Sequence, residues 1–343
     1  MPEAIRGSKD NAVIRQRGTG FDAIIDASAL RRMTAAQKNV QLRATLLGAI
    51  PVIIWGGALP IMRAFQSRIG LPRTLGAVFA GAGLLSVIHR VLRRTPFPGS
   101  AVFANPYLYG RWVFFVVHEA SVTIAVSIVH RENVPLVILI NYLWPTLTIG
   151  ASVLFAGVRV TKPLAVVGGS CVVIASLAFE VLDGQMDSLD VFRSPDTLGY
   201  CIAFQGALSW ALYSALTRRA GKESGGGLVI PLFQLTLALA LPLSFIPGLN
   251  VYSSFSSVDA VLLALYCFLQ FLAYLFWDRS MRLGNVIVIS LFADFIPWLS
   301  LLAAHILLHI NMGVTTVFSA ITLVLGAITT RYGTMLRPSD AEE

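Results

Sequence analysis

Two carboxylates stand out because each falls in the middle of a long apolar stretch. Glu119 follows His118 in one stretch, and Asp294 lies in another. A charged side chain at the centre of a bilayer costs on the order of 2.5–3.5 kcal/mol even on permissive scales. An unpaired carboxylate at that depth indicates a partner for a cationic substrate group or a proton site. A protonated carboxyl, or one held by nearby hydroxyl or amide groups, is the open alternative.

Aromatic and polar side chains accompany these carboxylates at similar depth. Trp55 and Trp210 lie at midspan, away from the interfaces where tryptophan is usual. Aromatic walls at midplane suit a ligand with an apolar or planar side chain, although core packing explains them almost as well. Gln205, Ser209 and Tyr213 are spaced i, i+4 and i+8, so they share one helix face that could hydrogen-bond a polar head group.

Two prolines interrupt apolar segments at corresponding places. Pro145 and Pro297 each remove a backbone donor, which frees the carbonyls of Asn141 and Ala293. Within a membrane, such carbonyls are tolerated where they line a cavity or meet a polar neighbour, and a kink that serves packing alone is the open alternative. We therefore take Pro145 and Pro297 as hinge or kink positions. The predicted substrate-binding set is Trp55, Glu119, Asn141, Tyr142, Gln205, Ser209, Trp210, Tyr213, Asp294 and Trp298.

The remaining reactive side chains predict no metal site, no catalytic residue and no cofactor. His305 and His309 have i, i+4 spacing but no nearby carboxylate. The three cysteines all fall in apolar segments, where we expect small apolar fillers, not a disulfide framework: Cys171, Cys201 and Cys267. A Gly-x-x-x-x-Gly-Lys loop is absent from the sequence, so ATP is not expected to drive this chain directly.

The elements that must position these residues follow from composition. The chain is 56% hydrophobic and 13% charged, with a mean hydropathy of +0.73. A membrane-spanning helix needs about 20 apolar residues. Ten such runs are present: 44–65, 72–90, 111–130, 134–157, 162–182, 197–217, 227–247, 258–278, 285–309 and 313–331. The sequence therefore predicts an all-α membrane protein of ten transmembrane helices with no room for a soluble domain.

The two halves of the chain repeat each other. Asn133-Val134 and Pro145-Thr146-Leu147 align without gaps on Asn285-Val286 and Pro297-Trp298-Leu299, at an offset of 152 residues. Trp55 corresponds to Trp210 at an offset of 155. Paired repeats with helices broken at midplane are typical of secondary transporters. We expect two inverted five-helix repeats.

Charge sets the expected orientation. With the N-terminus inside, 21 Lys and Arg residues fall on the cytoplasmic side and 5 outside, so both termini are predicted to be cytoplasmic. The net charge of +8 then indicates attraction to the inner leaflet and needs no nucleic-acid partner. The expected domains are a basic tail (1–42), the first repeat (43–182), an extracytoplasmic loop (183–196), the second repeat (197–331) and a C-terminal tail (332–343).

The N-terminal tail lacks the apolar core of a signal peptide. Residues 21–33 have partial helical periodicity, and Thr19 could cap them. A short amphipathic helix on the inner leaflet is one interpretation, and a disordered tail is the other.

Several motifs resemble the drug/metabolite transporter superfamily, and within it the bacterial aromatic amino-acid exporters. The resemblance covers roughly residues 44 to 331. It implies ten helices in two inverted repeats with cytoplasmic termini, and a functional glutamate at Glu119. Asp294 departs from the exporters, which have a neutral residue there. The motifs that carry the resemblance are Asn141-Tyr142-Leu143-Trp144-Pro145-Thr146-Leu147-Thr148, His118-Glu119, Ala203-Phe204-Gln205-Gly206-Ala207 with Ser209-Trp210-Ala211-Leu212-Tyr213, and Leu283-Gly284-Asn285-Val286.

The sequence favours a secondary transporter in the bacterial inner membrane, working as a monomer by alternating access. The resemblance favours export of aromatic or other apolar amino acids, and hydrophobic cations or drug-like amines are the alternative substrate class. An intramembrane transferase is the alternative outside transport, although such enzymes cluster His, Asp and Glu near one interface. A channel is less favoured, because no ring of like charges appears in the sequence. Proton coupling, direction and exact substrate stay open.

Overall fold

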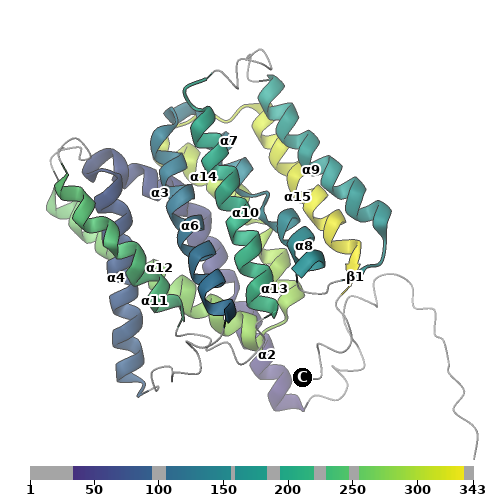
Figure 1. The fold of residues 1–343 in the computed structure, drawn as a ribbon, viewed down its shortest axis with the longest axis horizontal. Coiled ribbons are helices and arrows are strands. Elements are labelled where there is room, and N and C mark those ends of the chain that lie inside the picture. Colours follow the sequence, from purple (N-terminus) through teal and green to yellow (C-terminus); the bar gives the residue numbers. More distant parts are fainter. Residues whose placement is uncertain are drawn as a thin grey trace, which may run out of the picture.

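The computed structural model describes residues 34–94, 106–155, 159–183, 194–219, 229–246 and 255–335, almost all of them helical (Figure 1). Eight helical segments in these ranges are long and apolar enough to cross a membrane. The chain is therefore an all-α, multi-pass membrane protein, as its composition predicts. The candidate amphipathic helix at 21–33, its cap Thr19 and most of the 183–196 loop lie outside the described residues.

The first half of the chain begins with a helix that the sequence analysis did not expect. Residues 35–47 form α2, and Thr34 and Gln37 make a capping box at its start. The predicted boundary at residue 42 falls within this helix, and the division into domains stays a prediction. The elements that follow are α3 (Ala49–Ile69), α4 (Leu71–Leu92), α6 (Pro106–Ile128), the 3-10 turn η1 (Arg131–Asn133), α7 (Val134–Asn141), α8 (Trp144–Phe155), β1 (Arg159–Val160) and α9 (Pro163–Asp183).

The second half contains the two expected spans that do not meet the length and hydropathy of a membrane-crossing helix. One is α10, which is long but carries polar side chains such as Gln205 and Ser209. The other is the shorter apolar stretch Ile230–Phe245, whose second half is a 3-10 helix that contains Pro242. The elements are α10 (Thr197–Arg219), α11 (Val229–Leu237), η2 (Ala238–Phe245), α12 (Ser257–Leu283), α13 (Val286–Ala293), α14 (Ile296–Leu308), α15 (Val314–Tyr332) and β2 (Thr334–Met335).

Two membrane helices are broken where the prolines predict it. α7 ends at Asn141 and α8 starts at Trp144, with Pro145 as its second residue. α13 ends at Ala293 and α14 starts at Ile296, again with proline in second place. Proline is favourable there because the first helical N–H groups have no intrahelical acceptor. The two breaks have the 152-residue offset of the sequence repeat.

The last helix of each half pairs with the other along its whole length. In Figure 1, α9 and α15 lie side by side at one flank of the bundle. A Cβ atom on Gly169 would lie 2.5 Å from the backbone nitrogen of Thr330, so only glycine permits this approach. At one end the pair continues into the short antiparallel ladder of β1 and β2. At the other end Thr316 donates a hydrogen bond to Glu180, with 2.7 Å between the oxygens.

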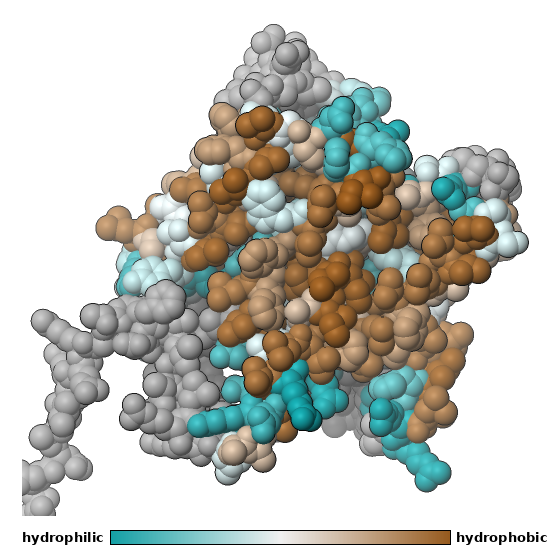
Figure 2. Space-filling model, turned by 180° about the vertical axis from the view of Figure 1, so that it is seen from behind, coloured by the Kyte–Doolittle hydropathy of each residue, from teal (hydrophilic) through white to brown (hydrophobic). Residues whose placement is uncertain are grey.

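The apolar core is divided into two large clusters, and two tryptophans join them. One cluster centres on α7 and α14, and the other on α4, α6 and α12. Trp55 and Trp144 pack against both. Outside the core, Figure 2 shows a broad hydrophobic band with hydrophilic residues gathered above and below it. That distribution is the one a bilayer demands of its protein surface.

Candidate functional site

The two tryptophans related by the repeat are neighbours. Trp55 of α3 and Trp210 of α10 meet edge to face, with ring centroids 6.3 Å apart and an interplanar angle of 79°. Trp144 of α8 approaches Trp210 in the same geometry, also at 6.3 Å. The rings therefore bring together helices from both halves of the chain. Trp144 lies within the motif that suggested the family, yet the sequence analysis did not select it.

Helix α12 supplies a wall of this aromatic cluster that the sequence analysis missed. Tyr274 and Trp277 lie 5.4 and 5.1 Å from the ring centroid of Trp55. The indole N–H of Trp55 donates to Gln270 Oε1 at 3.3 Å, and Gln270 Nε2 donates to the hydroxyl of Tyr266 at 2.6 Å. Tyr266, Gln270 and Tyr274 are spaced i, i+4 and i+8, and this periodicity was the signal available in the sequence.

Glu119 lies beside the cluster and is hydrogen-bonded. The hydroxyl of Tyr274 donates to its carboxylate. One helical turn earlier, the fully buried ring of Phe115 packs 5.7 Å from both Tyr213 and Tyr274. The neighbouring His118 is bound through Nδ1 to the carbonyl of Gly206 at 2.9 Å. The predicted carboxylate therefore faces aromatic rings, but it is not unpaired.

Asp294 occupies a different environment from the one expected. Its carboxylate accepts hydrogen bonds from both terminal nitrogens of Arg331, each at 2.9 Å. The interpretation of Asp294 as an unpaired charge is therefore wrong. The reason is the length of the arginine side chain, which reaches from the end of α15 to the break between α13 and α14. The ion pair joins two elements of the second half.

The polar groups at the break between α7 and α8 are buried. The hydroxyl of Tyr142 lies 3.4 Å from Ser300 Oγ of α14, and both residues are buried. The side-chain oxygen of Asn141 is also buried and has no hydrogen-bond partner among the described residues. A buried acceptor without a donor is costly, so Asn141 marks a place where a ligand donor would be stabilised.

The three residues predicted to share one face of α10, Gln205, Ser209 and Tyr213, do not lie in the same environment. Ser209 and Trp210 are buried, and Tyr213 is half-buried beside Phe115. Gln205 is exposed on a stripe with Phe204 and Leu208, so the structure does not bring it to the aromatic cluster. A four-residue step turns a helix by somewhat more than one turn, which moves Gln205 beyond the buried face.

A buried arginine was also missed. Arg111, at the start of α6, is only 5% exposed and donates to the hydroxyl of Thr217 at 3.1 Å. Thr217 and Arg111 both hydrogen-bond to Tyr213. This guanidinium therefore reaches Tyr213, at the edge of the aromatic cluster.

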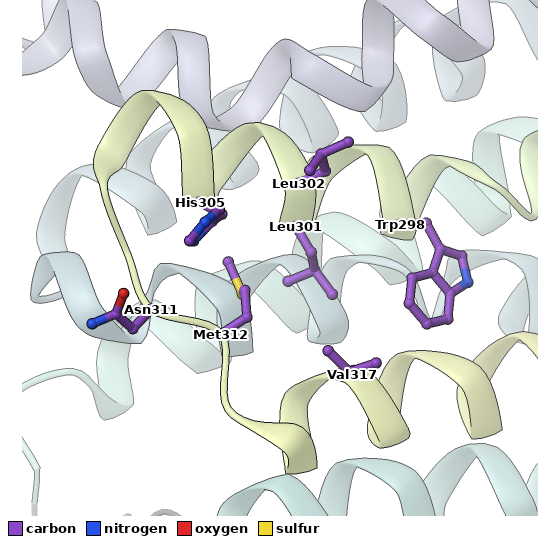
Figure 3. A pocket seen from close by; sticks show the side chains of 7 residues that line it. All are labelled: Trp298, Leu301, Leu302, His305, Asn311, Met312 and Val317. Atoms are coloured by element: carbon purple, nitrogen blue, oxygen red, sulfur yellow. The ribbon is translucent and has the colours of Figure 1, made fainter.

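Two cavities are described, and neither is lined by the tryptophan pair. The first, with a volume of about 560 Å³, is lined by Trp298, Leu301, Leu302, His305, Asn311, Met312 and Val317 (Figure 3). The second, of about 330 Å³, lies between α4, η2 and Phe255. Trp298 therefore belongs to a separate hollow between α14 and α15, and Trp55 and Trp210 pack against each other in this conformation.

A polar cluster at the ends of the membrane helices holds the start of α10. The carboxylate of Asp196 accepts hydrogen bonds from the backbone N–H of His130 at 3.0 Å and from the side-chain amide of Asn133 at 2.5 Å. The His130 ring nitrogen lies 3.0 Å from the same carboxylate. Burial acts to raise the pKa of Asp196, but these hydrogen bonds outweigh it and lower the pKa below its ordinary value.

The cysteines and histidines hold no visible cofactor site. Among the described residues there is no group of three His, Cys, Asp or Glu side chains that could bind a metal. Cys267 is buried, whereas Cys171 and Cys201 are exposed, so only the first acts as a core filler. His305 is bound through Nδ1 to the carbonyl of Ile310 at 2.7 Å.

The arrangement has a clear chemical character. Several aromatic rings surround a short stretch of α6 that carries one carboxylate. Such a group of rings favours an apolar or planar side chain, and its faces also attract a cation. A carboxylate at its edge would pair with an ammonium group. The cluster can therefore recognise a small amphipathic amine.

Comparisons with known proteins agree with this chemistry. Residues 197–332 match the EamA-like transporter family. The chain is 26% identical over 292 residues to the aromatic amino acid exporter YddG of Salmonella typhimurium, which covers 83% of this chain and 96% of that protein. YddG of Escherichia coli is 26% identical over 276 residues, covering 78% and 89%. A solved crystal structure matches with a TM-score of 0.58 and 21% identity, covering 84% of this chain and 97% of that one. That last likeness shows a shared fold.

Proposed function

We propose, from the premise that residues 197–332 carry an EamA-like transporter domain, that this chain is a secondary transporter exporting aromatic or other apolar amino acids. The observation that carries the proposal is the contact of Trp55 with Trp210 beside the Glu119–Tyr274 hydrogen bond. The relatives named above are exporters of aromatic amino acids, which supports the same substrate class. They also favour transport over a transferase reaction.

The substrate's two charged groups have separate candidate partners. Its ammonium would pair with Glu119, and its apolar ring would replace part of the contact between Trp55 and Trp210. Its carboxylate needs donors, because an unpaired charge in this environment would cost several kcal/mol. The candidate donors are the buried hydroxyl of Ser209, the amide of Asn141 and the guanidinium of Arg111.

For the transport cycle we propose alternating access between two inverted repeats of five helices each. The two proline breaks at the same offset and the contact of Trp55 with Trp210 support this arrangement. Rocking of one repeat against the other would open the aromatic cluster to each side in turn. The basic residues favour cytoplasmic termini and an inner-membrane location, in which α10 and α11–η2 would complete ten passes.

A second candidate substrate class is a hydrophobic organic cation. The specific observation in its favour is that Glu119 contacts the hydroxyl of Tyr274 and lies among rings that would attract a cation. Arg111 at the edge of the cluster favours the amino acid instead, because a substrate with no carboxylate gains nothing from it.

Counterflow in proteoliposomes tests the proposal. Vesicles loaded with unlabelled tryptophan should accumulate labelled tryptophan transiently, and vesicles without protein should not. Phenylalanine should compete with the label, and lysine should not. Accumulation driven by a hydrophobic amine but not by tryptophan would favour the second candidate. No counterflow of either compound would reject both.

A further inference from the structure

The hollow between α14 and α15 is separate from the aromatic cluster. It has a volume of about 560 Å³, and its walls are mostly apolar: Trp298, Leu301, Leu302, Met312 and Val317 (Figure 3). His305 and Asn311 give it one polar end. Leu301 is buried and forms part of its floor. We call this hollow the α14–α15 cleft.

The flanks of the α14–α15 cleft are exposed, apolar and part of membrane-spanning helices. On α14, Leu302 and Ile306 are 55% and 57% exposed, and on α15, Val317 is 39% exposed. A cleft between such flanks opens to the hydrocarbon of the bilayer. Water would find hydrogen-bonding partners only at its polar end, so the apolar part can be filled only by hydrocarbon.

The polar end lies where α14 leaves the membrane. The helix ends at Leu308, whose carbonyl accepts a hydrogen bond from Arg131. His305 is held by the carbonyl of Ile310, which fixes its ring at the mouth of the cleft, near Asn311. This corner therefore offers amide, imidazole and guanidinium groups at the depth of lipid head groups, although Glu132 stands next to Arg131.

The opposite end of the cleft is closed by structure already described. Arg331 of α15 is bound to Asp294 at the start of α14. α15 is also held tightly against α9 by the close approach of Gly169 and Thr330. α15 therefore cannot collapse onto α14 without breaking these contacts, and the space between them needs an occupant, because empty apolar volume is costly.

We propose that the α14–α15 cleft binds a phospholipid, with one acyl chain between Leu302 and Val317 and the phosphate at Asn311 and Arg131. The length of the cleft, from Trp298 at midspan to Asn311 at the surface, matches a chain that enters from the leaflet at that end. The lipid spaces α14 from α15. The proposal does not depend on the transported substrate.

Photolabelling of the full-length protein tests this site. The protein is reconstituted in phosphatidylethanolamine and phosphatidylglycerol vesicles that contain a phosphatidylethanolamine with a diazirine in one acyl chain, and the adducts are mapped by mass spectrometry. We expect adducts to concentrate in residues 298–317. Equal labelling of the exposed α12 face at Val258, Val261 and Leu265 would overturn the proposal.

Two matched pairs of variants keep the test specific. Val317→Trp and Leu302→Trp fill the cleft and should lower its adduct yield at least tenfold. Val314→Trp and Leu307→Trp place the same ring on exposed positions that do not line the cleft, and they should leave the yield unchanged. A cleft yield that survives both filling variants, with gel filtration showing folded protein, would overturn the proposal. Displacement of the label by excess tryptophan would also overturn it, since the cleft would then be a substrate path.

Discussion

Asp294 and Arg331 form a paired set of hydrogen bonds, both 2.9 Å long, between a helix break and the end of the last membrane helix. The Asp294 side chain is 3% exposed and that of Arg331 is 25% exposed. A buried ion pair adds little net stability over apolar residues, but loss of one partner strands the other charge. The pair therefore fixes where α15 lies relative to the break.

The ion pair predicts that its two single variants will lose unequal amounts of stability in a double-mutant cycle. Arg331→Gln strands the buried carboxylate and should destabilise the protein by about 3 kcal/mol, whereas Asp294→Asn should cost less because Arg331 reaches the surface. The double variant should recover part of the loss. Thermal unfolding in detergent measures these effects, and Arg279→Gln, on an exposed position of α12, is the control. Strictly additive losses would show that the two side chains do not interact.

Truncation of the Trp210 side chain should reduce the rate of transport much more than it reduces the stability of the folded protein. Trp210→Ala removes a ring that contacts Trp55, Trp144 and Tyr213, and we expect tryptophan counterflow to fall at least tenfold. Phe204→Ala on the exposed face of the same helix should transport normally. If Trp210→Ala unfolds in detergent yet transports at the normal rate per folded molecule, the tryptophan serves the core only.

Neutralising Glu119 should discriminate between substrates by their ammonium group. Glu119→Gln keeps a partner for the Tyr274 hydroxyl but removes the negative charge. Binding of tryptophan should weaken by at least roughly tenfold, because a charge-assisted hydrogen bond contributes about 1.5–3 kcal/mol. The inhibitory affinity of indole-3-propionate, which lacks the ammonium, should not fall. Equal losses for both compounds would assign Glu119 a structural role.

Acid should loosen the polar cluster around Asp196. Its folded pKa lies below the unfolded value because His130 and Asn133 donate to its carboxylate. Its contribution to stability is therefore complete above the unfolded pKa, near 4, and is lost as the pH falls through the folded pKa. Asp196→Asn should lower the Tm at pH 7 and flatten the decline of Tm below pH 4. A variant whose Tm still falls as steeply in acid would assign that decline to other groups.

The proposed orientation is tested by cysteine accessibility in a chain with Cys171, Cys201 and Cys267 replaced. Asn311→Cys lies in the α14–α15 connection, and Arg94→Cys follows α4; both positions are exposed. In intact cells a membrane-impermeant maleimide should label the first and not the second. The opposite pattern would invert the topology.

How much of this protein can be predicted from its sequence depends on the range of each interaction. The helical membrane architecture follows from apolar runs whose length must match the bilayer, and the structure confirms it. The two helix breaks follow from Pro145 and Pro297, because a missing backbone donor acts within one turn of the chain. Both are local consequences of residue type.

The full set of residues at the candidate site could be identified only from the tertiary structure. Trp55 and Trp210 could be selected as a pair by their repeat, but Tyr274 and Gln270 were missed because α12 has no counterpart motif that drew attention to it. Gln205 lies on the exposed face of α10, and the sequence could not show this because the i, i+4 rule identifies neighbours on a helix without saying which face is buried. The orientation of a helix about its axis depends on what packs around it.

Electrostatic partners were the least predictable from the chain. Composition determined that charges inside the membrane would be few and would need partners, and the distribution of Lys and Arg along the chain set the expected orientation. Only the fold decided that Asp294 meets Arg331 and that Glu119 meets Tyr274, residues 37 and 155 positions apart in the chain. Sequence limits which charges can be buried, because desolvation depends on residue type. Tertiary structure chooses their partners, because a hydrogen bond requires contact within about 3 Å.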